Sequence, residues 1–370
     1  MNICFFCYTP FHVFNAISVK HNLYPNDAAD LYLFNSVSGG TNVLYENIVA
    51  ISLFRNVYKI DSLRWKHYSK AQKLLHLHER FFHINKKIIN AKKNYKKLKK
   101  ANRVYDEVWS YGSEMELYLI LGISLRSNPK TQYKCYEEGE GSYRLPCTNA
   151  LKNNEISYLE NKLHIKMPEI PNLMLFYLPS CVSPIVTAPI DNMPLVSKEL
   201  LNDIYPKIWH YNPNTINYDV FFMALADPDQ SFAVSIYEML QSYNSINVTI
   251  KAHPRYTAPF IGKDIELLDC GTTPWEIVCG GIDKIESRLL IGVYSTALIT
   301  AKSVYNKEPF IIFLNEMDSL KDNQRITKEK EEILENFIQT YSDKSKIFIP
   351  KTLEELYDCV SVWKKEIHGN

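Results

Sequence analysis

The sequence lacks the glycine-rich loops with which most nucleotide-binding enzymes hold a phosphate chain. Neither Gly-x-x-x-x-Gly-Lys-Ser/Thr nor Gly-x-Gly-x-x-Gly occurs anywhere in its 370 residues. This absence argues against ATPases and ordinary dinucleotide enzymes. Any nucleotide that the chain binds must therefore be held by a different arrangement of residues.

Long hydrophobic runs and a charge bias are absent as well, and the one Cys-x-x-Cys spacing, Cys4 to Cys7, lies in an apolar run. No apolar run reaches the ~18 residues of a membrane span, and a net charge of +1 gives no general attraction to nucleic acid. Residues 1–6 carry no basic group before their apolar side chains, so we expect a buried strand there rather than a secretory signal. Cys4 and Cys7 point to opposite faces of such a strand, so we expect buried free thiols in a reducing cytoplasm.

What is present is the composition of a two-domain α/β protein. A hydrophobic content of 46% excludes a disordered chain, and a length of 370 residues favours two domains. Strand-like and helix-like segments alternate, which is typical of parallel sheets covered by helices. The pattern predicts strands at 2–8, 30–36, 55–60, 104–110, 131–136, 218–226, 246–252, 265–268, 288–294, 308–313 and 346–349, and helices at 11–22, 42–52, 67–100, 114–125, 297–304 and 353–367.

A proline-rich stretch, residues 167–215, interrupts this alternation and is the best candidate for a domain boundary. We therefore expect two Rossmann-like domains that face a central cleft. The first spans residues 1–190, a linker covers 191–215, and the second spans 216–350. A helix in 351–370 is expected to pack back on the first domain.

An acid pair follows one of the predicted strands. Glu137 and Glu138 come directly after the β-rich run 131–136 and before Gly139. Because the carboxyl ends of parallel strands are where open α/β sheets bind ligands, a carboxylate there suits general-base work on a hydroxyl. Neighbouring residues of a strand point opposite ways, so we expect Glu138 to face the ligand and Glu137 to support the turn.

Two further strand ends carry groups that suit a phosphate. His253, Pro254 and Arg255 follow the run 246–252, and Ser295 and Thr296 follow the run 288–294. An imidazolium can bind a phosphate or protonate a leaving group, and an arginine adds a planar donor fork. Hydroxyls at the start of a helix, beside its free N–H groups, form an anion site.

Glu276 lies between these two strand ends, in the first turn expected after Pro274. A carboxylate at this place can accept hydrogen bonds from both hydroxyls of a ribose. It can equally complement the dipole of its own helix without any ligand.

These elements, in this order, resemble the motifs of bacterial sialyltransferases. The residues around these motifs most resemble those of the lipooligosaccharide α-2,3-sialyltransferases of glycosyltransferase family 52. The matching stretches are Cys7-Tyr8-Thr9-Pro10, Glu137-Glu138-Gly139, Ala252-His253-Pro254-Arg255 and Ser295-Thr296-Ala297-Leu298. The resemblance implies a GT-B fold, CMP-sialic acid as donor, a galactose-terminated oligosaccharide as acceptor, inversion at the anomeric carbon, and no metal or other cofactor.

The resemblance also implies a role for each matching residue. His253 would bind the CMP phosphate and act as the acid toward it, Ser295 and Thr296 would hold the same phosphate, and Glu276 would bind the ribose. Pro254 and Arg255 belong to the same donor site. Thr9, Pro10 and Glu137 would lie on the acceptor side. The chain departs from this family in lacking an amino-terminal membrane anchor and in having Glu-Glu where its members have Asp-Asp.

The general base stays open between two carboxylates. Glu138 matches the acid motif of related sialyltransferases, whereas Asp229 matches the position that the lipooligosaccharide members favour. Asp227-Pro228-Asp229 is the chain's one Asp-x-Asp sequence, which elsewhere marks a metal-bound sugar diphosphate. A CMP-sugar has a single phosphate, so a histidine, hydroxyls and helix N–H groups can neutralise it without a cation.

Several alternatives stay open at this point. They are a polysialyltransferase, a glycosyltransferase of the same fold that uses a UDP-sugar, and a non-catalytic glycan-binding protein of capsule assembly. The lysine-rich segment Lys86–Lys100 is either a solvated helix face or a contact with an anionic membrane or glycan. We expect a cytoplasmic protein, with peripheral membrane contact and a homodimer left open.

Overall fold

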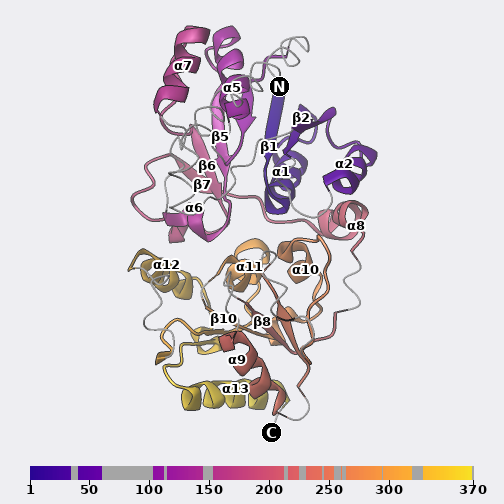
Figure 1. Ribbon diagram of the computed structural model, residues 1–370, viewed down its shortest axis with the longest axis vertical. Coiled ribbons are helices and arrows are strands. Elements are labelled where there is room, and N and C mark those ends of the chain that lie inside the picture. Colours follow the sequence, from indigo (N-terminus) through magenta and orange to yellow (C-terminus); the bar gives the residue numbers. More distant parts are fainter. Residues whose placement is uncertain are drawn as a thin grey trace, which may run out of the picture. The chain divides into compact units, whose positions relative to one another are not determined.

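The computed structural model describes residues 1–34, 41–60, 103–111, 115–144, 153–211, 216–224, 231–243, 246–253, 260, 264–293, 295–318 and 328–368. The chain divides into two compact units (Figure 1). The first holds Met1–Glu138, Leu145–Phe176 and Ile185–Pro194, and the second holds Gly139–Arg144, Tyr177–Pro184 and Leu195–Asn370. The chain therefore passes from one unit to the other more than once, and the first passage lies within the acid motif, between Glu138 and Gly139.

The first unit is built on a parallel sheet of seven strands in the order β3-β2-β1-β4-β5-β6-β7. Strand β1 is apolar at almost every position, because helices cover both faces of a parallel sheet. The strands are β1 (Asn2–Cys7), β2 (Ala28–Phe34), β3 (Asn56–Ile60), β4 (Glu107–Trp109), β5 (Gln132–Tyr136), β6 (Leu173–Phe176) and β7 (Ile190–Asn192), and the helices are α1 (Pro10–Leu23), α2 (Thr41–Ala50), α5 (Met115–Ser127) and α7 (Asn153–Leu163).

The second unit is built on a parallel sheet of five strands in the order β12-β11-β10-β8-β9. The strands are β8 (Val220–Met223), β9 (Val248–Lys251), β10 (Leu289–Gly292), β11 (Phe310–Phe313) and β12 (Ile347–Phe348). The helices are α6 (Glu140–Arg144), the 3-10 turn η1 (Pro179–Cys181), the π-helical turn η2 (Leu200–Ile204), α8 (Tyr205–Trp209), α9 (Ser231–Gln241), α10 (Trp275–Gly281), η5 (Ile285–Ser287), α11 (Thr296–Tyr305), α12 (Lys328–Gln339), η7 (Lys344–Lys346) and α13 (Leu353–His368).

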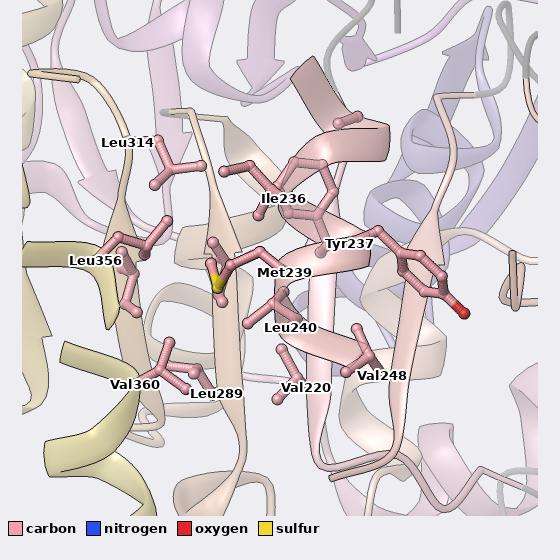
Figure 2. Packing of buried hydrophobic residues seen from close by; sticks show 14 of the residues in the cluster. Val220, Ile236, Tyr237, Met239, Leu240, Val248, Leu289, Leu314, Leu356 and Val360 are labelled. Carbon is pink, nitrogen blue, oxygen red and sulfur yellow. The ribbon is translucent and has the colours of Figure 1, made fainter. Parts of the chain in front are cut away.

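Alternate side chains of β8 point to opposite faces of the second sheet. Val220 and Phe222 face a buried cluster that α9 and α13 complete, as Figure 2 shows for Leu240 of α9 and Val360 of α13. Phe221 points to the other face, where its ring lies 5.7 Å from that of Trp275 in α10. The sheet is therefore the middle of three layers, and its carboxyl edge stays clear for the loops that carry the polar motifs.

The expected pattern of alternating strands is confirmed for both sheets, but the proline-rich stretch 167–215 is not a plain linker. It contains β6 and β7, which extend the first sheet beyond β5. The sequence pattern did not predict strand β6, because its apolar run Leu173–Phe176 is short and lies among prolines. The segment 265–268, expected to be a strand, makes only an isolated bridge between Ile250 and Leu267.

Helix α13 lies in the second unit. It buries Leu356, Val360 and Trp363 against the sheet of that unit, and the indole Nε1 of Trp363 donates to the carbonyl of Ser287 at 3.2 Å. These side chains therefore contribute to the core of the second unit, whereas the sequence led us to expect packing on the first domain. The cysteines among the described residues are all free thiols, as expected.

A carboxylate clamp holds the far end of α11. Glu308 accepts hydrogen bonds from Lys302 Nζ at 2.6 Å, from Ser342 Oγ at 2.7 Å and from the N–H groups of Ser342 and Asp343 at 3.0 and 3.3 Å. Burial opposes ionisation of this nearly buried group, but these donors outweigh it and lower the pKa of Glu308 to about 2. The clamp fixes α11, whose first turn carries Ser295 and Thr296.

We expect Glu308→Gln to destabilise the protein by about 3 kcal/mol at neutral pH, because a pKa lowered by roughly 2.5 units corresponds to that free energy. The folded pKa lies below the unfolded one, so this stability is present above about pH 4.5 and is lost as the pH falls toward 2. Urea unfolding at several pH values checks this. The exposed Glu335→Gln change on α12 is the control. A gap between wild type and Glu308→Gln that persists unchanged at pH 2.5 would contradict the clamp.

Candidate functional site

The order of strands in the first sheet creates a crevice at the carboxyl edge. Strands β2 and β3 lie on one side of β1, while β4 to β7 follow on the other side. In such sheets the chain leaves neighbouring strands in opposite directions, and ligands bind beside the point of reversal. The segments at this edge are the loop Tyr8-Thr9 after β1, Ser110 after β4, and the acid motif after β5.

Thr9 and Pro10 begin helix α1. The hydroxyl of Thr9 accepts the N–H of His12 at 3.1 Å, and Pro10 occupies the first helical position, where a missing N–H costs nothing. Both residues, expected on the acceptor side, thus have a structural role in placing the first turn of α1. That turn presents His12, which the sequence analysis missed. The available signal was a histidine three residues after a capping threonine at the first strand end.

The two carboxylates of the acid motif differ in exposure. Glu137 is 1% exposed, and its backbone is fixed by hydrogen bonds from its N–H to the carbonyl of Leu175 and from Asn15 Nδ2 to its own carbonyl. The side chain of Glu138 is 44% exposed. Of the two, Glu138 is therefore the carboxylate that a ligand can reach.

Glu138 and His12 approach each other within the first unit. Nε2 of His12 lies 3.8 Å from Oε1 of Glu138, and the imidazole itself is 1% exposed. Burial lowers the pKa of His12 to about 3, so the ring is neutral at physiological pH. Burial also raises the pKa of Glu138 to about 7, although water screens part of this effect because the side chain stays partly exposed. A carboxyl that titrates near neutrality is suited to general-base catalysis.

The second sheet reverses between β8 and β10, and two of the expected residues follow strand ends at that edge. His253 follows the end of β9 by two residues and is half-buried, and Ser295 follows the end of β10. Asp227, Asp229, Pro254, Arg255 and the segment Lys86–Lys100 lie outside the described residues. Within the part of the chain that is described, no group of three or more His, Cys, Asp or Glu side chains could hold a metal ion.

Ser295 and Thr296 lie at the start of helix α11. Ser295 is the extended N-cap residue, yet its side chain makes no capping bond, and its buried Oγ has no hydrogen-bond partner among the described residues. An unpaired buried hydroxyl costs about 1–3 kcal/mol, so a polar ligand atom is a fitting partner for it. The N-terminus of α11 lies beside it, and the N-terminus of a helix favours an anion.

Helix α10 begins next to the start of α11. Nε1 of Trp275 donates to the carbonyl of Ala297 at 2.8 Å, and the hydroxyl of Tyr305 donates to the carbonyl of Glu276 at 2.6 Å. Burial raises the pKa of Glu276, which is 8% exposed, while its own N–H and the charge of Lys251 act in the opposite direction. Trp275 thus joins the starts of α10 and α11, and Lys251 favours the ionised form of Glu276; neither residue was predicted from the sequence.

Gly139 also contributes to this part of the second unit. Its φ of +115° lies in the region that favours glycine, and a Cβ there would come within 2.8 Å of the hydroxyl of Thr296. The segment that begins at Gly139 continues as α6, which packs against α12 of the same unit. The glycine of the acid motif is therefore required both by the turn and by the close approach of Thr296.

Comparison with solved structures identifies the architecture. A spinosyn rhamnosyltransferase, SpnG, complexed with thymidine diphosphate matches 100% of this chain and 92% of its own, with a TM-score of 0.52 and 8% identity. The glycosyltransferase of kitacinnamycin matches 100% and 91%, with a TM-score of 0.54 and 8% identity. VinC in complex with dTDP matches 98% and 90%, with a TM-score of 0.52 and 8% identity. The chain has the GT-B fold. At these identities the likeness shows the fold alone. No protein-family model and no curated protein matches the sequence.

The GT-B fold agrees with what the sequence resemblance implied about architecture. No helix in the described part of the chain is long and apolar enough to cross a membrane.

We expect Gly139→Ala to destabilise the protein by about 1–3 kcal/mol, because alanine at this φ is strained and its Cβ meets Thr296. Gly141→Ala is the matched control: it lies two residues on in α6, and nothing stands within 4 Å of its added Cβ. Helix propensity makes the control neutral or slightly stabilising. Urea unfolding followed by tryptophan fluorescence compares the two. Equal stability of both variants would show that the turn tolerates a side chain.

Proposed function

We propose that this protein is an inverting glycosyltransferase that moves sialic acid from CMP-sialic acid to a galactose-terminated glycan, in a single displacement and without a metal. The α-2,3 linkage is part of the proposal and comes from the sequence resemblance. The observation that carries the donor site is the unpaired, buried hydroxyl of Ser295 at the start of α11, held beside the start of α10. This arrangement offers hydrogen-bond donors for one phosphate group.

In this proposal the second unit holds the donor. Ser295, Thr296 and the N–H groups of α11 bind the CMP phosphate, with His253 beside them and Pro254 and Arg255 following in the chain. The Glu276 carboxylate accepts hydrogen bonds from the ribose hydroxyls. Its burial lets these bonds form in a medium of low dielectric, where they are stronger than in water.

The chemistry needs one base and one acid. The acceptor hydroxyl attacks the anomeric carbon as the bond from that carbon to the CMP phosphate oxygen breaks. The base, Glu138 or Asp229, takes the hydroxyl proton, and His253 gives a proton to the departing phosphate. Glu138 has the two properties that a base requires, an exposed carboxyl and a pKa raised by burial to about 7. Thr9, Pro10 and Glu137 shape the acceptor side around it.

A UDP- or dTDP-sugar-dependent glycosyltransferase is the second candidate. The solved structures that share the fold include SpnG complexed with thymidine diphosphate and VinC in complex with dTDP. The sequence motifs favour the CMP-sugar. Extension of a polysialic acid chain, peripheral membrane contact through Lys86–Lys100, and a homodimer are further proposals that depend on residues or assemblies outside the described part of the chain.

A donor screen tests the proposed activity. The protein is incubated in EDTA with a galactoside and with CMP-sialic acid, UDP-glucose or a UDP-hexosamine, and products are identified by mass spectrometry. We expect transfer from CMP-sialic acid alone, undiminished by EDTA, and a loss of ~10²-fold or more in His253→Ala, the scale for removing a general acid. Transfer from a UDP-sugar that requires added magnesium or manganese would overturn the proposal and make Asp227 and Asp229 metal ligands. Binding without any transfer would favour a glycan-binding protein.

The two candidate bases are separated by Glu138→Gln and Asp229→Asn, which keep shape and remove basicity. If Glu138 is the base, kcat/KM of the wild type rises with pH to a plateau above about 7, since only the ionised carboxylate accepts the proton. Glu138→Gln then loses ~10²-fold or more in turnover with unchanged CMP affinity, while Asp229→Asn keeps the pH profile. The reverse result assigns the base to Asp229, and two active variants would refute both assignments.

A further inference from the structure

The described part of the first unit buries a donor that lacks a partner at the same edge of the sheet as Glu138. Nε2 of His12 is inaccessible to solvent and makes no hydrogen bond. An orphaned buried donor costs about 1–3 kcal/mol, a penalty that a protein retains where the group serves a ligand or a reacting residue. His12 has no part in the mechanism given above.

The hydrogen bonds of His12 fix which of its nitrogens carries the proton. The N–H of Tyr8 donates to Nδ1 at 3.2 Å, so Nδ1 is an acceptor and carries no hydrogen. Because the buried ring is neutral, the hydrogen is on Nε2. The N–H of His12 donates to Oγ1 of Thr9, which places the ring in the first turn of α1, and the positive end of that helix disfavours a second proton on the ring.

The carboxylate of Glu138 lies near this nitrogen. Oε1 of Glu138 lies 3.8 Å from Nε2, which is beyond a hydrogen bond but within a side-chain adjustment of about 0.8 Å from one. The rings of Tyr8 and Tyr136 stand 5.8 Å from the imidazole, nearly perpendicular and tilted, and keep it from turning away. Oε1 of Glu138 is therefore within reach of Nε2 after a small side-chain movement.

We propose that His12 is the positioning residue of Glu138: its Nε2–H donates to Oε1 of the ionised carboxylate and leaves Oε2 to accept the proton of the acceptor hydroxyl. This inference rests on the proposed function, in which Glu138 is a base. During the transfer the hydroxyl proton moves to Oε2 as the new carbon–oxygen bond forms, and Glu138 later returns it to solvent. His12 keeps its own proton throughout and stays neutral.

Other groups around the pair set its electrostatics. Glu137 precedes Glu138 and is buried, and Tyr8 and Tyr136 contact the imidazole. The phenol of Tyr136 donates to the carbonyl of Phe6 at 2.7 Å, and burial raises its pKa far above neutrality. Burial thus keeps the phenol of Tyr136 and the imidazole of His12 neutral at pH 7.

A direct measurement of the carboxyl tests the coupling without any turnover. The protein is labelled with glutamate carrying ¹³C at the side-chain carboxyl, and Glu138→Gln identifies the Glu138 signal. His12→Leu removes the donor, so we expect the pKa of Glu138 to rise by about 1 unit, equivalent to a tenfold change in its ionisation. His12→Gln keeps a donor and should shift it much less. His21→Gln, in the last turn of α1, is the control that should leave it unchanged. An unchanged pKa in His12→Leu, or equal shifts in His12→Leu and His12→Gln, overturns the proposal.

A second measurement uses the wild-type side chain, in case His12→Leu fails to fold. The ¹⁵N signal of His12 Nε2 should shift as Glu138 ionises between pH 5 and 9, and should stay constant in Glu138→Gln. A constant signal in the wild type overturns the proposal.

Kinetics then separate this role from a general structural one. If the sialyl transfer is confirmed, the rising limb of kcat/KM in His12→Leu should move about 1 pH unit higher, with most of the rate regained at high pH. A loss that is equal at every pH would mean that His12 only supports the fold. If no donor is used, the proposed function fails, yet the carboxyl and imidazole titrations still decide whether His12 acts on Glu138.

Discussion

Parallel pairing of the strands is the constraint from which the candidate site follows. Every strand pair in the two sheets is parallel, so all carboxyl ends of a sheet meet at one edge. Residues far apart in the sequence, such as Thr9 and Glu138, or His253 and Ser295, are thereby brought to a common edge. Each sheet also reverses its strand order there, which leaves space beside the point of reversal.

The acid motif lies both at the carboxyl end of β5 and at the point where the chain first passes from one unit to the other. The first passage of the chain falls between Glu138 and Gly139, so the exposed carboxylate ends one unit and the glycine begins the next. Gly139 has a positive φ and no room for a side chain against Thr296, and this contact lies wholly within the second unit. The acid motif therefore combines an exposed carboxylate at Glu138 with a position, Gly139, that has no room for a side chain.

Burial gives the polar groups of the site their chemical character. The pKa of Glu138 is raised, the pKa of His12 is lowered, and Glu276 is kept largely out of water, each through desolvation. Unpaired atoms, Nε2 of His12 and Oγ of Ser295, are further costs of the same kind. These costs are the physical reason for proposing that the atoms serve ligand binding and proton transfer.

The sequence by itself determined the class of fold and the edge at which the site lies. The alternating apolar runs predicted both parallel sheets, and Glu137-Glu138, His253 and Ser295-Thr296 were expected at strand ends because polar residues directly follow buried strands. It could not predict β6 and β7, since a short run such as Leu173–Phe176 is a strand only through its pairing with β5. The pattern of apolar residues in a short segment does not show which strand that segment pairs with.

Only the tertiary structure decided which polar groups meet. His12 lies 126 residues before Glu138 in the chain, and its approach to that carboxylate depends on β1 and β5 flanking β4 in one sheet. The bond from Trp275 to Ala297, which joins the starts of two helices, depends likewise on how α10 and α11 pack. Such contacts arise from the order of strands and the direction of side chains in space. A sequence read residue by residue identifies the chemical groups, whereas the fold determines their distances and the water around them.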